Sequence, residues 1–283
     1  MAETVVWIDS SGLTLPIRVE WNVSGRFAPR AEIVEAEVPG VPGSRVREVR
    51  HVTKQFTLPV WITADDEVAL RTVTRELVKR MDPLRGPGKI RVTAPGGDQR
   101  EITCLVSSGL DMVEALGSTS APTLQRTPLV FRAHDPYWAE LAPTNLAFDS
   151  GEAVSFFPFF PLRLSSSEIF SDGTADNVGD VDTWPVWTIR GPAEDITLRN
   201  VTTGKYLTLN VSLLTGESVV IDTRPGRKSV THSSGANLFR NLSSLSSMWP
   251  LLPGANAVRV EMTGSTPEVS QVLLSWLPLY LSV

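Results

Sequence analysis

The densest group of side chains that could do chemistry is a run of aspartates between residues 172 and 182. The run consists of Asp172, Asp176, Asp180 and Asp182. Carboxylates at this density could bind calcium, but an EF-hand loop places its ligands at fixed positions and closes with a bidentate glutamate. This run has neither feature. A solvated acidic loop is the favoured interpretation, and the sequence predicts no metal site.

Catalytic arrangements have even less support. His134 and Asp135 are neighbours, but no serine lies in a G-x-S-x-G elbow. Cys104 falls inside an apparent strand, as expected of a small core residue. Glu194 and Asp195 are consecutive on a predicted strand, so they would point to opposite faces and could not share a glycosidic bond. We therefore predict that the chain is not an enzyme.

A superficially phosphate-loop-like segment spans residues 85–89 and reads Arg-Gly-Pro-Gly-Lys. It lacks the G-x-x-x-x-G-K-[ST] pattern, and a strand follows it, whereas a phosphate loop leads into a helix whose N-terminus holds the anion. The segment is predicted to be a turn, and no cofactor is expected.

Sugar binding is the alternative that the aromatic residues leave open. Trp184 and Trp249 each precede a proline in an expected loop, and they are the candidates for stacking on a carbohydrate of a host cell surface. Trp187 is in phase with Ile189 and is expected in the core. A carbohydrate-binding module is therefore retained as the alternative function.

Composition narrows the remaining classes. One cysteine excludes an intrachain disulfide framework, and with only three histidines a structural zinc site is not expected. The net charge of −5 arises entirely after Asp135. A chain without surplus positive charge has no general electrostatic attraction for the phosphates of a nucleic acid, so specific nucleic-acid binding is not expected.

Membrane insertion and export by a secretory signal are not expected either. The most apolar stretch, residues 272–283, is too short to span a bilayer and contains Pro278. The first residues carry an acid where a secretory signal has positive charge, and no apolar segment follows them.

The first half predicts an α+β domain with one amphipathic helix, over residues 64–81. Its apolar stripe consists of Leu70, Val73, Leu77, Val78 and Met81. Acidic residues occupy the first turn of this helix and basic residues the last turn, where each complements the helix dipole. Pro83 disfavours continuation of the helix beyond Asp82. Segments 89–94 and 100–106 are predicted to form a hairpin, and 56–62 and 128–133 further strands against which the helix packs.

The second half predicts an antiparallel β-sandwich. Period-two alternation recurs around residues 196–199, 207–211, 219–222 and 258–262, with glycine turns between these segments. Segment 139–183 shows no clear alternation of apolar and polar residues. Its phenylalanine-proline run at 156–161 is expected to form an edge strand or a connecting arm, covered by the same chain or by a neighbouring subunit.

The order of these blocks resembles the distal tail (Dit-like) family of siphophages. The residues that carry the resemblance are VPGVPGSRVREV at 38–49, the segment Met81 to Gly88, the Asp135-Pro136-Tyr137-Trp138 junction, Asn177 to Asp180, Trp184-Pro185, Asn200 to Gly204, Ile221 to Thr223 and Leu252 to Asn256. Lys54-Gln55 departs from the more usual Arg-Glu pair.

The resemblance implies a ring-forming, belt-type domain over residues 1–138 and a galectin-like β-sandwich domain over residues 139–283. It further implies a homo-oligomeric ring, usually of six copies, at the distal end of the virion tail. Its implied partners are the tail tube protein on one side and the tail hub or tail-associated protein, with the receptor-binding machinery, on the other. Synthesis would take place in the host cytoplasm.

Overall fold

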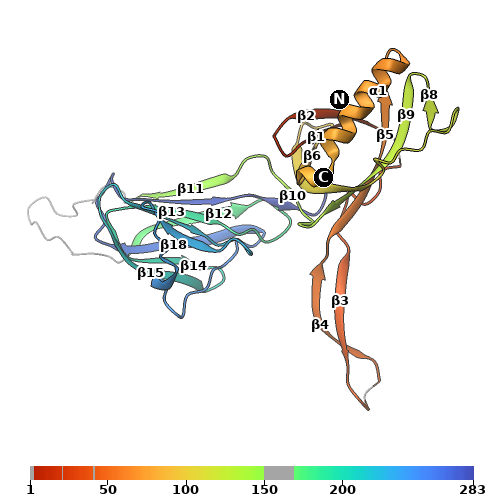
Figure 1. Ribbon diagram of the computed structural model, residues 1–283. Helices are drawn as coiled ribbons and strands as arrows, with labels where there is room; N and C mark the ends of the chain where they lie inside the picture. Colours follow the sequence, from red (N-terminus) through yellow and green to blue (C-terminus); the bar gives the residue numbers. More distant parts are fainter. Residues whose placement is uncertain (1–2, 21, 41, 150–168) are drawn as a thin grey trace, which may run out of the picture. The chain divides into compact units, whose positions relative to one another are not determined.

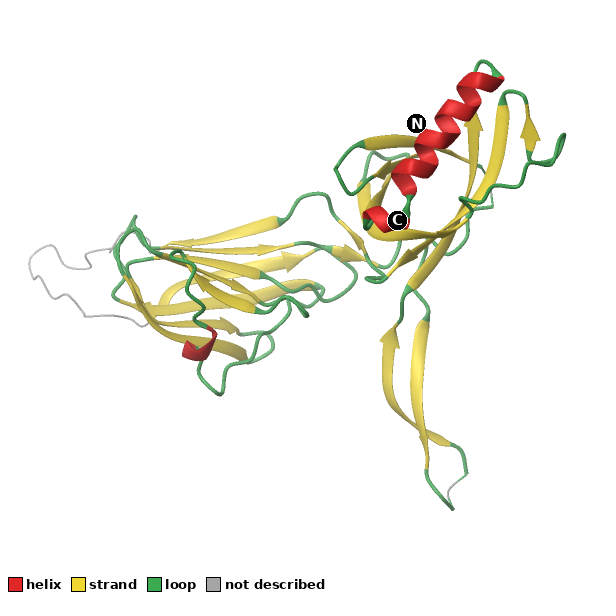
Figure 2. Ribbon diagram, viewed as in Figure 1, coloured by secondary structure: helices red, strands yellow, loops and turns green. Residues whose placement is uncertain are grey.

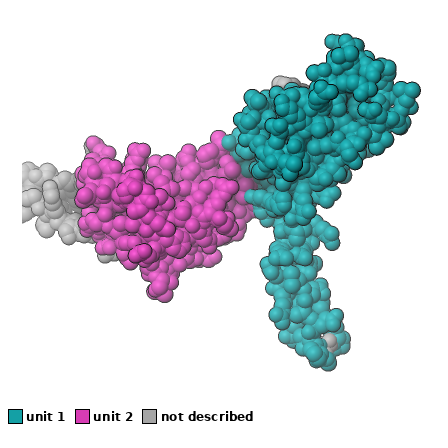
Figure 3. All heavy atoms as spheres, in the orientation of Figure 1, with its two compact units in different colours: residues 1–141, 280–283 teal, residues 142–279 magenta. Residues whose placement is uncertain are grey.

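The structure is a computed structural model that describes residues 3–20, 22–40, 42–149 and 169–283 (Figure 1). Strands dominate it, as Figure 2 shows, and α1 is the one α-helix among the described residues. The chain divides into two compact units, which are Met1–Leu141 with Tyr280–Val283, and Ala142–Leu279 (Figure 3). A mainly β fold with one helix was predicted, and this prediction is confirmed.

The first unit is built on a sheet that closes on itself. Its closed part contains β7 (Gln99–Ser108), β6 (Gly88–Thr93), β1 (Thr4–Ile8), β2 (Thr14–Val19), β5 (Lys54–Thr63) and β9 (Leu124–Ala133), in this order. An additional pairing between β7 and β9 joins the two ends, so the strands form an antiparallel barrel. The hairpin of β6 and β7 and the pairing of β5 with β9 lie where the sequence predicted strands.

Short strands extend this sheet at both ends. They are β8 (Ser120–Ala121), which pairs with β9, and β10 (Trp138–Ala139) and β20 (Leu279–Tyr280), which follow β7. Alternate barrel residues are fully buried, because period two turns every second side chain inward.

Helix α1 (Glu67–Met81) begins three residues later than predicted, because Asp66 is its N-cap and accepts a hydrogen bond from the Ala69 amide at 2.7 Å. Leu70, Leu77 and Met81 are buried in the barrel core. Val73, expected on the same stripe, is 42% exposed, so the helix buries a narrower face than predicted. A short 3-10 helix, Pro83–Arg85, follows α1.

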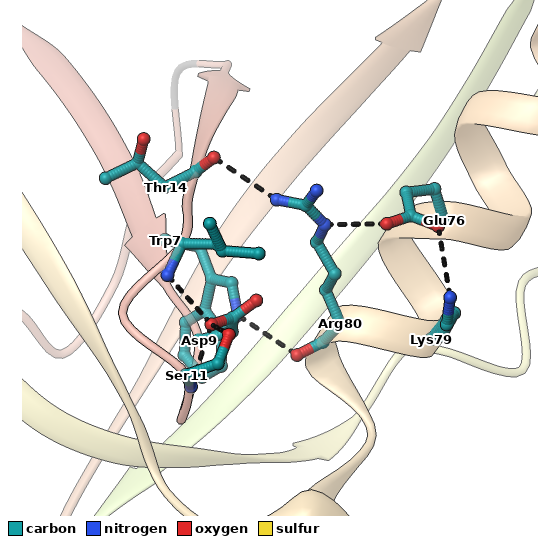
Figure 4. Close-up of polar contacts among 8 residues, drawn as sticks. Trp7, Asp9, Ser11, Thr14, Glu76, Lys79 and Arg80 are labelled. Atoms are coloured by element: carbon teal, nitrogen blue, oxygen red, sulfur yellow. Dashed lines mark hydrogen bonds and ion pairs between the residues drawn. The ribbon is translucent and has the colours of Figure 1, made fainter.

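The C-terminal end of α1 is tied to the hairpin of β1 and β2 (Figure 4). The Trp7 indole Nε1 donates a hydrogen bond to the Arg80 carbonyl at 3.3 Å. The Arg80 guanidinium donates to the Thr14 carbonyl at 3.3 Å and to Glu76 at 2.8 Å. The Arg80 carbonyl is one of the backbone groups that a helix end leaves without an intrahelical partner. Its bond with Trp7, together with the bond from Arg80 to Thr14, fixes the helix against the barrel.

The C-terminal residues return to the first unit, although the predicted boundary assigned them to the second domain. The Arg100 guanidinium lies 3.7 Å from the ring centroid of Tyr280 and donates to the Ser282 carbonyl at 2.6 Å. Tyr280 donates to Glu140 at 3.0 Å, and Lys54 Nζ donates to the Leu281 carbonyl at 3.0 Å. These contacts hold the chain end against the barrel.

The second unit is a sandwich of two antiparallel sheets. One sheet has the order β11 (Thr144–Asp149), β19 (Gln271–Trp276), β13 (Val186–Arg190), β16 (Ser218–Asp222) and β17 (Ser229–His232). The other has the order β12 (Ile169–Asn177), β18 (Gly254–Thr263), β14 (Ala193–Asn200) and β15 (Lys205–Leu213). A 3-10 turn, Phe239–Asn241, precedes β18. The inward-facing residues of both sheets form one core.

Three details of this unit differ from the predictions or fall outside them. Strands β11 and β12 lie in segment 139–183 but outside residues 156–161, where an edge strand or a connecting arm was expected. A β-bulge with φ of 48° at Asp195 interrupts the expected alternation and leaves both Glu194 and Asp195 exposed. The phenylalanine-proline run at 156–161 lies outside the described residues.

Candidate assembly surface

The residues considered for metal and catalytic chemistry lie apart or are occupied otherwise. No three His, Cys, Asp or Glu side chains of the described segments are grouped closely enough to bind a metal ion. The Asp172 carboxylate forms a bidentate pair with Arg259, at 2.7 and 2.9 Å. His134 and Asp135 are exposed, and Asp135 accepts from the Tyr137 amide at 3.4 Å. None of these contacts assembles a reactive site.

Cys104 is a core residue of β7, 2% exposed. Burial in apolar surroundings raises the pKa of its thiol to about 12, because the thiolate loses its hydration there. The thiol is therefore protonated at neutral pH and a poor nucleophile.

The two candidate sugar-stacking tryptophans have different surroundings. Trp249 is 2% exposed, lies edge-on to Trp187 at a centroid distance of 5.6 Å, and donates through Nε1 to the Leu198 carbonyl at 3.3 Å. It is a core residue and has no face open to a ligand. Trp184 is half-buried, and Lys228 Nζ lies 5.8 Å from its ring centroid. The carbohydrate alternative therefore rests on Trp184 alone.

A two-stranded hairpin is the surface feature that the sequence did not predict. Strands β3 (Ala31–Glu37) and β4 (Ser44–His51) form a sheet of their own, which we call the arm. The arm leaves the barrel between β2 and β5 and extends away from it (Figure 1). Every residue of β4 is exposed, so the arm has almost no packing against the rest of its unit.

The arm has an apolar face without a partner in the first unit. Ile33 pairs with Val49, and Glu35 pairs with Val46 on the same side of the ribbon. Ile33, Val46 and Val49 are 55%, 60% and 61% exposed. An isolated two-stranded hairpin is at best marginally stable in water, since it cannot bury enough apolar surface. Contact with another protein surface would supply the missing burial.

The two strands of the arm carry opposite charge. Strand β3 contains only acidic charged residues, namely Glu32, Glu35 and Glu37. Strand β4 contains three arginines, Arg45, Arg47 and Arg50, with one acid, Glu48. Within the arm, Arg50 forms an ion pair with Glu32 at 2.9 Å and Glu35 accepts a hydrogen bond from Ser44. The described structure has no ion pair of Glu35, Glu37, Arg45 or Arg47.

The backbone of the arm is also open on both sides. Its sheet contains β3 and β4 alone among the described strands, so the outer edge of each strand lacks a ladder partner. A β-bulge lies between the Val34–Glu48 and Glu35–Val46 pairs, with Arg47 as the extra residue. Unpaired edges of this kind are surfaces to which a further strand can add.

Comparison with known proteins finds likenesses to components of phage tails. Residues 178–276 match the family of siphovirus-type tail components in its C-terminal domain. The crystal structure of the Dit protein of phage SPP1, described as a paradigm of the hub adsorption apparatus in phages that infect Gram-positive bacteria, has a TM-score of 0.68 with 15% identity. That likeness covers 97% of this chain and 98% of the SPP1 protein.

A chain of the phage P2 baseplate in its activated conformation has a TM-score of 0.50 at 9% identity, over 97% of this chain and 98% of that one. No curated protein sequence matches the chain. The chain therefore shares its fold with these phage proteins, and its residues 178–276 resemble the C-terminal domain of siphovirus-type tail components. Among them, the likeness to the SPP1 Dit protein extends over nearly the whole of both chains and agrees with the resemblance that the sequence indicated. No described helix is long and apolar enough to cross a membrane.

Proposed function

We propose that this chain forms a homo-oligomeric ring, of six copies, at the distal end of a siphophage tail, where it joins the tail tube to the tail hub and the receptor-binding machinery. The observation that carries the proposal is the likeness to the SPP1 Dit protein over nearly the whole of both chains. The role is structural and requires no catalysis, cofactor or metal.

The first unit supplies the ring contacts in this proposal, and the second unit forms the outer domain. Support comes from the arm, whose open edges and exposed apolar residues are suited to contact between subunits. Residues 1–135 contain equal numbers of basic and acidic side chains. A ring with no surplus positive charge would let DNA pass through its central opening without binding the phosphates.

Electron microscopy of labelled particles tests this function. An antibody against the chain should bind at the tail tip, and the purified chain should form rings with a central opening. Label along the tail tube, on the capsid or nowhere on the particle would overturn the proposal.

Carbohydrate binding by the second unit is a second candidate, supported by the half-buried Trp184 beside Lys228. A glycan array with the intact chain and the Trp184→Ala variant tests it. Binding that the variant loses would support this role, and an array without any bound glycan would remove it.

A further inference from the structure

The first unit is completed by residues 280–283, which we call the strap and which return to it after the second unit. Tyr280 ends strand β20, is 7% exposed and belongs to the barrel core, and Val283 packs against that core. A barrel built from residues 1–141 alone therefore lacks part of its own core. Because the strap follows residues 142–279 in the chain, it is the last part of the first unit to be synthesised.

The strap is attached to the barrel wall by one stacked ring and two hydrogen bonds. The Arg100 guanidinium lies 3.7 Å from the ring centroid of Tyr280 and donates to the Ser282 carbonyl at 2.6 Å. The Tyr280 hydroxyl donates to Glu140 at 3.0 Å. A cation over an aromatic face, with charged groups as hydrogen-bond partners beside it, holds the strap in one position.

The strap also supplies the partner of a buried amino group. Lys54 is 2% exposed, and its Nζ lies 5.6 Å from the ring centroid of Trp138. The Leu281 carbonyl, at 3.0 Å, is the one hydrogen-bond acceptor of Lys54 among the described residues. A buried ammonium group without an acceptor is costly, so the position of Lys54 depends on the docked strap.

Lys54 and Trp138 lie where the arm joins the barrel. Lys54 is the first residue of β5, three residues after His51 ends the arm. Trp138 donates through Nε1 to the Arg26 carbonyl at 3.0 Å, in the segment that leads into the arm. Both ends of the arm thus leave the barrel next to this pair of residues. Docking of the strap positions Lys54 and thereby fixes the root of the arm.

We propose that the strap is an assembly switch, in which the first unit can join a ring only when residues 280–283 are docked on it. The inference rests on the proposed ring. Domains fold in order as a chain leaves the ribosome. A chain that has not completed its second unit has no strap to dock, so its first unit is held back. Incomplete chains are thereby kept out of a ring in which they would lack the outer domain.

Co-expression of the wild type with a chain that stops at Leu279 tests the switch. The two chains carry tags of different mass, and native mass spectrometry of the purified rings counts each of them. The shortened chain should enter rings at about a tenth or less of its share in the cell extract, because an undocked majority lowers the apparent affinity in proportion.

Substitutions of Tyr280 test the same contact in the full-length chain. Tyr280→Ala removes the ring under Arg100 and should weaken ring assembly about tenfold in the association constant. Tyr280→Phe keeps the ring and loses only the bond to Glu140, so it should assemble nearly as the wild type does. The matched control is Tyr206→Ala in the second unit, where Arg199 lies 5.3 Å from the ring centroid. This control should assemble as the wild type does.

Hydrogen exchange distinguishes the switch from a general loss of structure. In Tyr280→Ala the amides beside the root of the arm, at residues 22–30 and 52–57, should exchange faster than in the wild type. Strand β6 of the barrel and strand β14 of the second unit should keep their protection, because local opening leaves the remaining strands paired.

The outcomes separate this inference from the proposed function. Rings that contain the shortened chain in proportion to its abundance would overturn the switch and leave the proposed ring intact. The same holds for a Tyr280→Ala chain that assembles like the wild type, or that exchanges faster throughout the barrel. Should the shortened chain fail to fold, the two Tyr280 variants decide between these results. A wild-type chain that forms no ring would overturn both the switch and the function.

Discussion

Gly88 of β6 lies against the indole ring of Trp7 of β1 so closely that no side-chain carbon fits between them. A Cβ atom on Gly88 would overlap the six-membered part of that ring and would also lie 2.6 Å from the Ile8 carbonyl oxygen. Trp7 cannot move away, because its ring is buried and its Nε1 is bonded to the Arg80 carbonyl. The glycine is therefore required by the barrel core.

We expect Gly88→Ala to lower the free energy of unfolding by about 1–3 kcal/mol, as overpacking of a filled core does. Chemical denaturation measures this change. The matched control is Gly96→Ala in the turn between β6 and β7, where an added Cβ meets no atom within 4 Å. Its free energy of unfolding should stay within about 0.5 kcal/mol of the wild type. Equal effects of the two substitutions would contradict the packing described for Trp7.

Trp249 and Trp184 should respond differently to truncation. Trp249→Ala removes a buried ring from the sandwich core and should cost about 3–5 kcal/mol of stability. Trp184→Ala removes a half-buried ring and its contact with Lys228, and should cost less than about 1 kcal/mol. Thermal unfolding of both variants checks this difference. A larger loss from Trp184→Ala would reverse the assignment of core and surface residues.

The sequence predicted the helix and those strands that bury one face against the rest of the chain. Ile196 and Leu198 of β14, and Val258 and Val260 of β18, are almost fully buried at the expected period of two. Helix α1 was predicted because the charges at its two ends, the proline that follows it and the spacing of its apolar residues agree. These signals are local, and they need no knowledge of the partner surface.

The missed elements depend on contacts that the sequence does not display. Strand β12 contains Gly173 and two aspartates, Asp172 and Asp176, residue types that are rare in strands. Gly173 is needed because a Cβ there would lie 2.8 Å from the ring of Phe148 on β11. The arm was missed because no side of it is buried in its own chain, so its strands lack the alternation of a half-buried sheet.

Trp249 was considered for sugar stacking because the sequence places it in a loop. The proline that follows it indicates irregular backbone, and Trp249 indeed lies between the 3-10 turn and β18. That irregular segment nevertheless places the ring in the core, edge-on to Trp187. Sequence alone does not distinguish a loop on the surface from one that packs inward.

Lys54 should make stability depend on pH in the alkaline range. Its side chain is 2% exposed, and burial lowers its pKa from 10.5 to about 8. Between these two values the unfolded chain binds more protons than the folded chain, so the free energy of unfolding should rise with pH from about 8 to about 10.5. Below about 8 both states hold the proton, and this contribution stays constant.

The Lys54→Met variant checks the assignment by urea denaturation at several pH values. It should lose the part of the alkaline rise that Lys54 contributes. A variant with the same pH dependence as the wild type would show that Lys54 is not the group responsible. Lys205→Met, at an exposed position of the second unit, is the control and should retain the rise.

Cys104 should be unreactive in the folded protein. Its pKa of about 12 leaves little thiolate near neutral pH, and the sulfur is shielded in β7. A thiol reagent such as DTNB should therefore react only as fast as the barrel opens, and at once in denaturant. Rapid reaction with the native chain would contradict the burial of this strand.

The most direct measurement of the central claim is the mass of the purified wild-type chain in solution, by mass photometry, beside a variant in which a short glycine-serine turn replaces residues 32–50. The wild type is expected to form a closed ring with six times the mass of one chain, and the arm-deleted variant to remain monomeric while both units stay folded. A wild-type chain that is monomeric at every concentration, and that forms no ring beside other tail proteins, would contradict the account.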